Sequence, residues 1–99
     1  MKIGTAIKTL RKQKGMGQKQ LAEICNISVN ALSQIETNMS FPQKATIRKL
    51  CEALNIPMAY LLLFSMSDED VADDKKTTFN YLNDALKAVL MDEIKKVEN

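Results

Sequence analysis

The segment from Val29 to Thr37 carries side chains whose chemistry suits the edges of DNA base pairs. Five of them fall at positions i, i+1, i+4, i+5 and i+8, so a helix places them on one face. They are Val29, Asn30, Ser33, Gln34 and Thr37. Asn and Gln amides pair with adenine edges, and a valine methyl contacts the thymine methyl. We expect this nearly uncharged face to read bases in the major groove, with a merely solvated face as the alternative.

The residues before this segment predict a second helix and a tight turn that position it. Over residues 18–25 the apolar side chains recur at helical spacing. Asn26 enters the left-handed conformation more readily than other residues with a side chain, so it suits the turn. Ser28 is a good N-cap, because its hydroxyl accepts a hydrogen bond from a free backbone N–H of the next helix. Two helices joined by a short turn are therefore expected.

Helical spacing of apolar residues predicts three further helices in the first 64 residues. One begins near Ile3 and ends at Gly15, and the other two open at Pro42 and Pro57, because proline is favoured in the first turn of a helix. The chain holds only 3 Gly and 2 Pro and is otherwise rich in helix-forming residues. We therefore expect an all-α protein with a five-helix domain over residues 1–64.

The rest of the chain predicts a linker and one amphipathic helix. Residues 65–77 are polar, acidic and without hydrophobic period, which indicates a linker. Residues 78–99 carry apolar side chains on one face of a helix, with Asn83 among the polar residues largely opposite. The apolar face comprises Phe79, Leu82, Leu86, Val89, Leu90, Ile94 and Val97. We expect its first five members to pair with a second copy, and folding back on the domain as a sixth helix is the alternative.

Net charge differs between the two parts of the chain. Residues 1–64 hold nine Lys and Arg against three Asp and Glu, a net charge of +6, and residues 65–99 hold five against nine, a net charge of −4. A basic domain suits a polyanionic partner, although net charge alone does not identify that partner. Lys19 and Lys44 lie near the starts of expected helices, where an ammonium group adds to the positive helix end. Each is a candidate contact to a DNA phosphate, or is otherwise merely solvated.

The composition argues against several other classes of function. Histidine is absent, which removes the commonest general base and nitrogen ligand, so we expect no metal site, no cofactor and no catalysis. Cys25 and Cys51 fall in apolar helical registers and are expected in the core rather than as nucleophiles. Gly15 and Gly17 lack the spacing of a phosphate-binding loop. No apolar stretch approaches the ~20 residues that cross a bilayer, so we expect a cytoplasmic protein without a membrane partner.

The run from Gln18 to Glu36 resembles the helix-turn-helix of the Cro/C1-type family of phage repressors and bacterial regulators. The resemblance covers residues 3–64 and implies a lambda-repressor-like fold of five helices. It implies that Gln18 contacts a phosphate or braces the base-reading helix, and that Arg11 and Glu36 form a structural pair. Asn38 stands where the family usually has a glycine and backbone amides meet the DNA backbone.

Residues from both lines of reasoning make up the expected DNA-binding set. They are Gln18, Lys19, Ser28, Val29, Asn30, Ser33, Gln34, Thr37, Asn38 and Lys44. One such module reads few base pairs, so two modules on half-sites one DNA turn apart usually supply the affinity. The first hypothesis is therefore a homodimeric transcriptional repressor of a double-stranded operator. The alternative is an antitoxin of the same fold, which neutralises a partner protein through its C-terminal region and represses its own operon.

Overall fold

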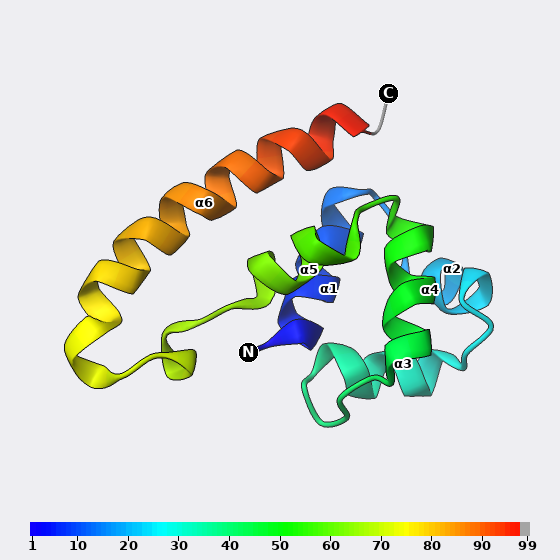
Figure 1. Ribbon diagram of the computed structural model, residues 1–99. Helices are drawn as coiled ribbons and strands as arrows, with labels where there is room; N and C mark the ends of the chain where they lie inside the picture. Colours follow the sequence, from blue (N-terminus) through cyan, green and yellow to red (C-terminus); the bar gives the residue numbers. More distant parts are fainter. Residues whose placement is uncertain (98–99) are drawn as a thin grey trace.

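The computed structural model describes residues 1–97 of the 99-residue chain, with side chains to residue 95. Its helices are α1 (Ile3–Gln13), α2 (Gln18–Ile24), α3 (Val29–Glu36), α4 (Lys44–Leu54), α5 (Met58–Ser65) and α6 (Lys76–Val97). Two short 3-10 turns, η1 (Asp68–Asp70) and η2 (Asp73–Lys75), lie between α5 and α6. No strand occurs in this described range, which confirms the prediction of an all-α fold with five helices followed by a C-terminal helix (Figure 1).

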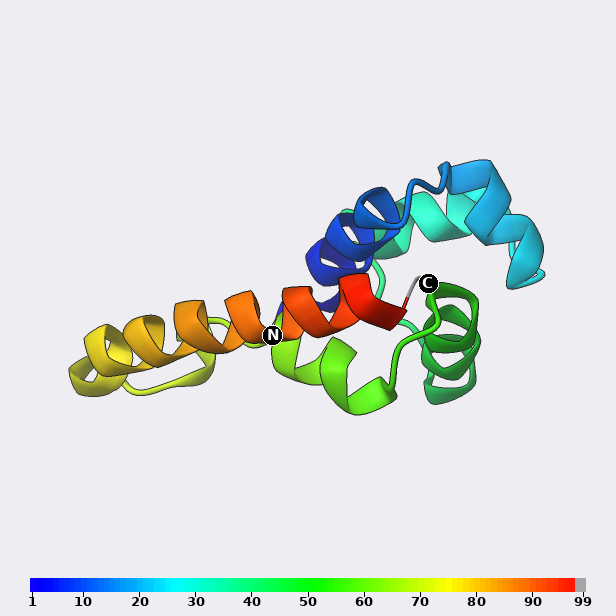
Figure 2. The ribbon, with the colours of Figure 1, turned by 90° about the horizontal axis from the view of Figure 1, so that it is seen from above.

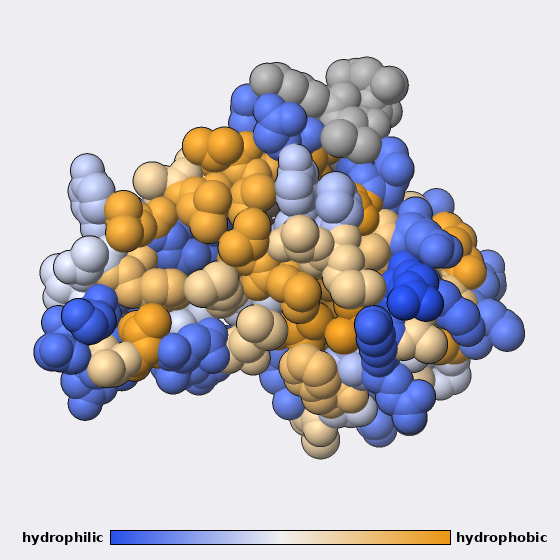
Figure 3. Space-filling model, viewed as in Figure 1, coloured by the Kyte–Doolittle hydropathy of each residue, from blue (hydrophilic) through white to orange (hydrophobic). Residues whose placement is uncertain are grey.

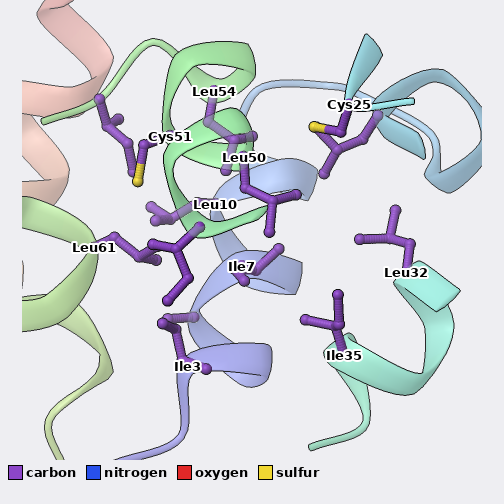
Figure 4. Close-up of a cluster of buried hydrophobic side chains, with 14 of the residues drawn as sticks. Ile3, Ile7, Leu10, Cys25, Leu32, Ile35, Leu50, Cys51, Leu54 and Leu61 are labelled. Carbon is purple, nitrogen blue, oxygen red and sulfur yellow. The ribbon is translucent and has the colours of Figure 1, made fainter. Parts of the chain in front are cut away.

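The hydrophobic core forms around α1, which packs against α3, α4 and α5. Ile3, Ile7 and Leu10 are buried because they recur at the spacing of one helix face. Figure 4 shows side chains of the surrounding helices converging on them. The buried members of α2 to α5 include Leu21, Leu32, Ile35, Leu50, Leu54 and Leu61. Each such side chain contributes about 1.5–3 kcal/mol on burial, so this cluster holds the five helices together.

Both cysteines lie in this core as free thiols (Figure 4). Burial raises the pKa of the Cys25 thiol, and the charge of Lys49 opposes that rise without cancelling it. Burial also raises the pKa of the Cys51 thiol, and the charge of Glu52 adds to the effect. A thiol that stays protonated and packed is a poor nucleophile, so both residues serve as small apolar side chains.

Two helices begin later than their prolines predict. α4 begins at Lys44, after the N-cap Gln43, and Pro42 is buried just before that cap. α5 begins at Met58, and Pro57 is its N-cap with a φ of −63°. The fixed φ of proline suits the approach to a helix, but it does not decide which residue becomes the first helical one.

The segment predicted as a linker is more ordered than its composition indicates. It contains η1 and η2, and α6 already begins at Lys76. Lys76 Nζ lies 3.0 Å from Asp73 Oδ1, three residues earlier. Because negative charge next to the positive end of a helix is stabilising, the acidic residues before Lys76 explain the early start.

α1 and α3 approach each other closely at Gly4. A Cβ atom at this position would lie 1.8 Å from the carbonyl oxygen of Ile35. The Gly4 backbone N–H donates to Asn38 Oδ1 at 3.0 Å. The first N–H groups of a helix have no partner within the helix, so the Asn38 side chain caps α1 from a distant part of the chain. Asn38 itself has a φ of 63°, a left-handed conformation that asparagine tolerates.

α6 uses only part of its apolar face to pack on the five-helix domain. Leu90 and Ile94 are buried, whereas Leu82 and Val89 remain 59% and 60% exposed. In Figure 2 the C-terminal half of α6 crosses the domain, and its N-terminal half projects beyond it. The helix therefore folds back on its own domain, as the alternative prediction had it, and still leaves an apolar strip open.

Asn83 is placed differently from its prediction. It was expected on the polar side of α6, but it is buried, and its Nδ2 donates to the Met66 carbonyl oxygen at 3.4 Å. Asn83, Leu90 and Ile94 are spaced so that they share one strip of the helix. The side of α6 that packs on the domain therefore differs from the centre of its apolar face. Asn83 can be buried on that side because its amide hydrogen-bonds to a backbone carbonyl.

The close approach at Gly4 predicts that serine substitutions at Gly4 and Gly17 differ strongly in their effect on the stability of the fold. Gly4→Ser should destabilise the fold by about 1–3 kcal/mol or more, because the new atoms overlap backbone that cannot move aside. Gly17→Ser is the matched control: nothing lies within 4 Å of a Cβ there, and the serine supplies an N-cap oxygen to α2. Urea unfolding of both variants measures this, and equal stabilities would contradict the close approach.

Candidate nucleic-acid interface

α2 and α3 form a helix-turn-helix whose turn is held by local hydrogen bonds. Asn26 has a φ of 55°, and the Ile27 N–H donates to the Ala22 carbonyl oxygen at 3.0 Å. Ser28 is the N-cap of α3, and its Oγ accepts a hydrogen bond from the Ala31 N–H at 3.0 Å. These bonds set where α3 begins and leave its opening turn at the molecular surface.

The outer face of α3 carries the residues predicted to read bases. Val29 is 43% exposed, Asn30 and Gln34 are exposed, and Ser33 is half-buried. The Thr37 hydroxyl lies 3.0 Å from the Ser33 carbonyl oxygen, so its proton is used within the helix. Asn30 and Gln34 therefore have the largest free hydrogen-bonding capacity on this face, since each amide offers donors and an acceptor.

A buried ion pair joins the end of α3 to α1. Arg11 Nε donates to Glu36 Oε2 at 2.7 Å, and Arg11 Nη2 donates to Glu36 Oε1 at 3.0 Å. The two side chains are only 8% and 1% exposed. Arg11 Nη1 also donates to the Met16 carbonyl oxygen at 2.8 Å. Because a bidentate pair fixes direction as well as distance, it orients α3 relative to α1.

Gln18 brings α2 into the same network. Its Nε2 donates to Glu36 Oε1 at 3.0 Å, so the Glu36 carboxylate is held from both preceding helices. Of the two roles that the resemblance implies for Gln18, this geometry matches the brace. The amide nitrogen carries a second N–H, which leaves one donor for a phosphate oxygen at the start of α2.

The Asn38 side chain makes its hydrogen bonds within the protein. Its Oδ1 accepts from the Gly4 N–H, and its Nδ2 donates to Thr5 Oγ1 at 2.8 Å. The amide is thus committed to α1, which sequence reasoning did not foresee. No local pattern signals it, because the partners lie more than thirty positions away.

Two lysines and two apolar side chains on the segments next to α3 in the chain are exposed. Lys19 in the first turn of α2 and Lys44 at the start of α4 are exposed, as a phosphate contact requires. Met39 and Phe41, in the loop between α3 and α4, are 81% and 66% exposed. No sequence pattern singled out these two loop residues. Loops have no hydrophobic periodicity, so the sequence does not show whether an apolar loop residue is exposed or buried.

Metal-ligand clusters and membrane-spanning helices were sought among the described residues. Among those residues, no cluster of three or more His, Cys, Asp or Glu side chains is arranged to hold a metal ion. None of the described helices combines the length and hydropathy needed to cross a membrane.

Known proteins show the same module. A family model described as helix-turn-helix matches residues 7–61. The transcriptional regulator SutR of Escherichia coli K12 is 40% identical over 57 residues, which are 58% of this chain and 32% of SutR. The immunity repressor of Bacillus phage phi105 is 29% identical over 96 residues, which are 97% of this chain and 64% of that protein. The regulator ImmR of Bacillus subtilis 168 is 37% identical over 62 residues, 63% of this chain and 49% of ImmR.

The relatives and the family model cover different shares of the sequences compared. The chain spans less than two thirds of the length of each of these relatives. The family model, in contrast, covers more than half of the chain and includes the whole α2–turn–α3 unit. The chain therefore belongs to the Cro/C1-type helix-turn-helix family.

Proposed function

We propose that the protein is a sequence-specific transcriptional regulator that binds double-stranded DNA, and that it acts as a homodimeric repressor. The observation that carries this proposal is the exposed, amide-bearing and uncharged face of α3, held from behind by the buried Arg11–Glu36 pair. The printed names of two relatives, a transcriptional regulator and a phage immunity repressor, agree with it.

Within this proposal, the exposed residues divide into base-reading and phosphate-binding groups. Asn30 and Gln34 pair with base edges, and Val29 contacts a thymine methyl. Ser28, Ser33 and Thr37 supply shorter polar contacts from the same face. Phosphate contacts come from Gln18, Lys19, Lys44 and the backbone at Asn38. The net charge of +6 over residues 1–64 supplies the general attraction to DNA.

The reading face predicts which variants lose sequence preference. Asn30→Ala and Gln34→Ala should each relax the motif selected from a random duplex pool, at about 1–3 kcal/mol for each lost bidentate base contact. Asn80→Ala is the control, because it removes the same amide from the N-terminal half of α6, which lies away from α3 (Figure 1), and it should leave the motif unchanged. Selections run at one fixed salt concentration measure this. Identical motifs from all four proteins would exclude α3 as the reader.

The buried pair acts in this proposal as a brace for the reading helix. Glu36→Gln leaves Arg11 buried without a charge partner and should destabilise the fold by about 3–5 kcal/mol. The double variant Arg11→Met with Glu36→Leu removes both charges and should regain most of that stability. The double variant should therefore fold. Because it also lacks the carboxylate that holds Gln18, it should bind the selected duplex more weakly and less specifically.

The double variant separates bracing from simple stability. Unfolding in urea gives the stability of each protein, and duplex titration gives its affinity. Glu23→Gln on the exposed side of α2 is the control for losing a carboxylate. A folded double variant with unchanged DNA specificity would show that the pair is dispensable for reading.

The open strip of α6 supports the homodimer. Leu82, Leu86 and Val89 are spaced by four and three residues, the alternation with which helices pair in coiled coils. Figure 3 shows apolar surface running along α6 and continuing toward α5, where Leu63 is also exposed. Two copies related by a two-fold axis can each present this strip to the other, since such an interface uses one self-complementary patch. Two reading helices on one duplex follow from that pairing.

Neighbouring positions on α6 test the dimer. Val89→Glu places a charge in the open strip and should yield a monomer that still folds, because Val89 is 60% exposed in the single chain. Ala88→Glu adds the same charge one residue away, outside the strip, and should leave the dimer intact. Sedimentation velocity measures both. A dimer that survives Val89→Glu, or a wild type that is monomeric at binding concentrations, contradicts pairing through α6.

The same strip is the one observation in favour of the antitoxin alternative. An unpaired apolar helix face suits a different protein as well as a second copy. A wild-type chain that is monomeric alone, and forms a stoichiometric complex with a protein encoded in the same operon through Leu82 and Val89, would favour that reading over the homodimer.

A further inference from the structure

A cavity lies where the N-terminal part of α1, the end of α5 and the middle of α6 meet. Its volume is about 260 Å³. Lys2, Thr5, Ala6 and Thr9 line it from the first helix and its N-cap, and Lys87 lines it from α6. The end of α5 and the residues after it complete the lining with Phe64, Ser65, Met66 and Ser67. None of these residues belongs to the predicted DNA-binding set.

The charges that line this cavity are both positive. Lys2 and Lys87 contribute ammonium groups, and no Asp or Glu is among the lining residues. The Lys87 Nζ lies 5.4 Å from the centre of the Phe64 ring, which places it at the cavity. Glu69 interacts electrostatically with Lys2 but pairs directly with the Met1 ammonium group at 3.1 Å. The lining therefore favours a negatively charged ligand.

The hydroxyl groups sharpen this preference. Thr9 Oγ1 donates to the Thr5 carbonyl oxygen at 3.0 Å, and Ser65 Oγ donates to the Leu62 carbonyl oxygen at 2.9 Å, so both protons are used. Thr5 Oγ1 accepts from Asn38 Nδ2, which leaves its own proton free to donate. Lys2, Lys87 and Thr5 thus offer donors, while Ala6, Phe64 and Met66 offer apolar surface.

We propose that this cavity binds a small organic monocarboxylate with a short apolar body. The carboxylate lies between the ammonium groups of Lys2 and Lys87 and accepts from the Thr5 hydroxyl, and the apolar body contacts Phe64 and Met66. Hydrogen bonds to charged partners are the stronger class. The apolar wall favours an organic body over a hydrated inorganic ion, because burying apolar surface is favourable. The volume suits a short aliphatic chain beyond the carboxylate, such as that of octanoate, rather than a larger cofactor.

Such a ligand would tie α6 to the DNA-binding module. Lys2 belongs to the module and Lys87 to α6, so one carboxylate bound to both stabilises the contact between α6 and the module. Thr5 also connects the cavity to Asn38 beside the reading helix. Regulation of DNA binding through this connection rests on the proposed function, whereas carboxylate binding itself does not.

Octanoate titration of the full chain tests the proposal without DNA. We expect octanoate at millimolar concentration to raise the Tm, by roughly 5–10 °C at a tenfold excess over its Kd. Lys2→Gln and Lys87→Gln should each weaken octanoate binding roughly tenfold or more. Lys95→Gln, at an exposed position near the end of α6, is the matched control and should bind as the wild type does.

Two further probes identify the chemistry that is recognised. Octan-1-ol has the same apolar body without the charge, and inorganic phosphate has charge without the apolar body, so neither should raise the Tm comparably. The proposal is overturned if octanoate has no effect, if octanol or phosphate matches it, or if the Lys2 and Lys87 variants respond as the wild type does. DNA binding by the wild type, measured separately, shows whether the proposed function stands when this site fails.

Discussion

The buried ion pair between Arg11 and Glu36 is the constraint on which the placement of α3 depends. Charges that leave water are costly unless they are paired and fully hydrogen-bonded, and here the carboxylate accepts from Arg11 and Gln18 while Arg11 also donates to the Met16 carbonyl oxygen. These partners come from α1, the turn after it, α2 and α3. All of these hydrogen bonds form only when the segments adopt one relative orientation. The network therefore fixes that orientation, whereas apolar contacts tolerate small shifts of one helix against another.

A second constraint acts at the other end of the α1–α3 contact. Gly4 allows the Ile35 carbonyl to approach the α1 backbone, and the Asn38 side chain caps α1 while its own backbone turns the chain away from α3. A glycine at position 38 permits the same turn but has no side chain to donate or accept. Asparagine therefore combines the conformation of the turn with a tertiary hydrogen bond. This contact and the ion pair together hold the C-terminal end of α3 against both ends of α1.

Local patterns predicted the helices well and the tertiary contacts unevenly. Apolar spacing and the Ser28 cap are properties of short segments, so the α2–turn–α3 unit and its exposed face could be read directly from the sequence. The role of Asn38 and the burial of Asn83 depend on carbonyl and N–H groups supplied by distant residues, and no periodicity reports those. The buried and the exposed apolar residues of α6 likewise form one apolar face in the sequence pattern, because hydropathy does not show which surface a helix packs against.

Chemical-shift mapping tests the central claim, that the braced outer face of α3 reads DNA, most directly. The isotope-labelled chain is titrated with a duplex that the wild type selects from a random pool, and again with a scrambled duplex at the same salt concentration. We predict that the side-chain amides of Asn30 and Gln34 shift strongly with the selected duplex only, together with backbone amides from Ser28 to Asn38. Equal shifts with both duplexes, or shifts centred on α6, would contradict it.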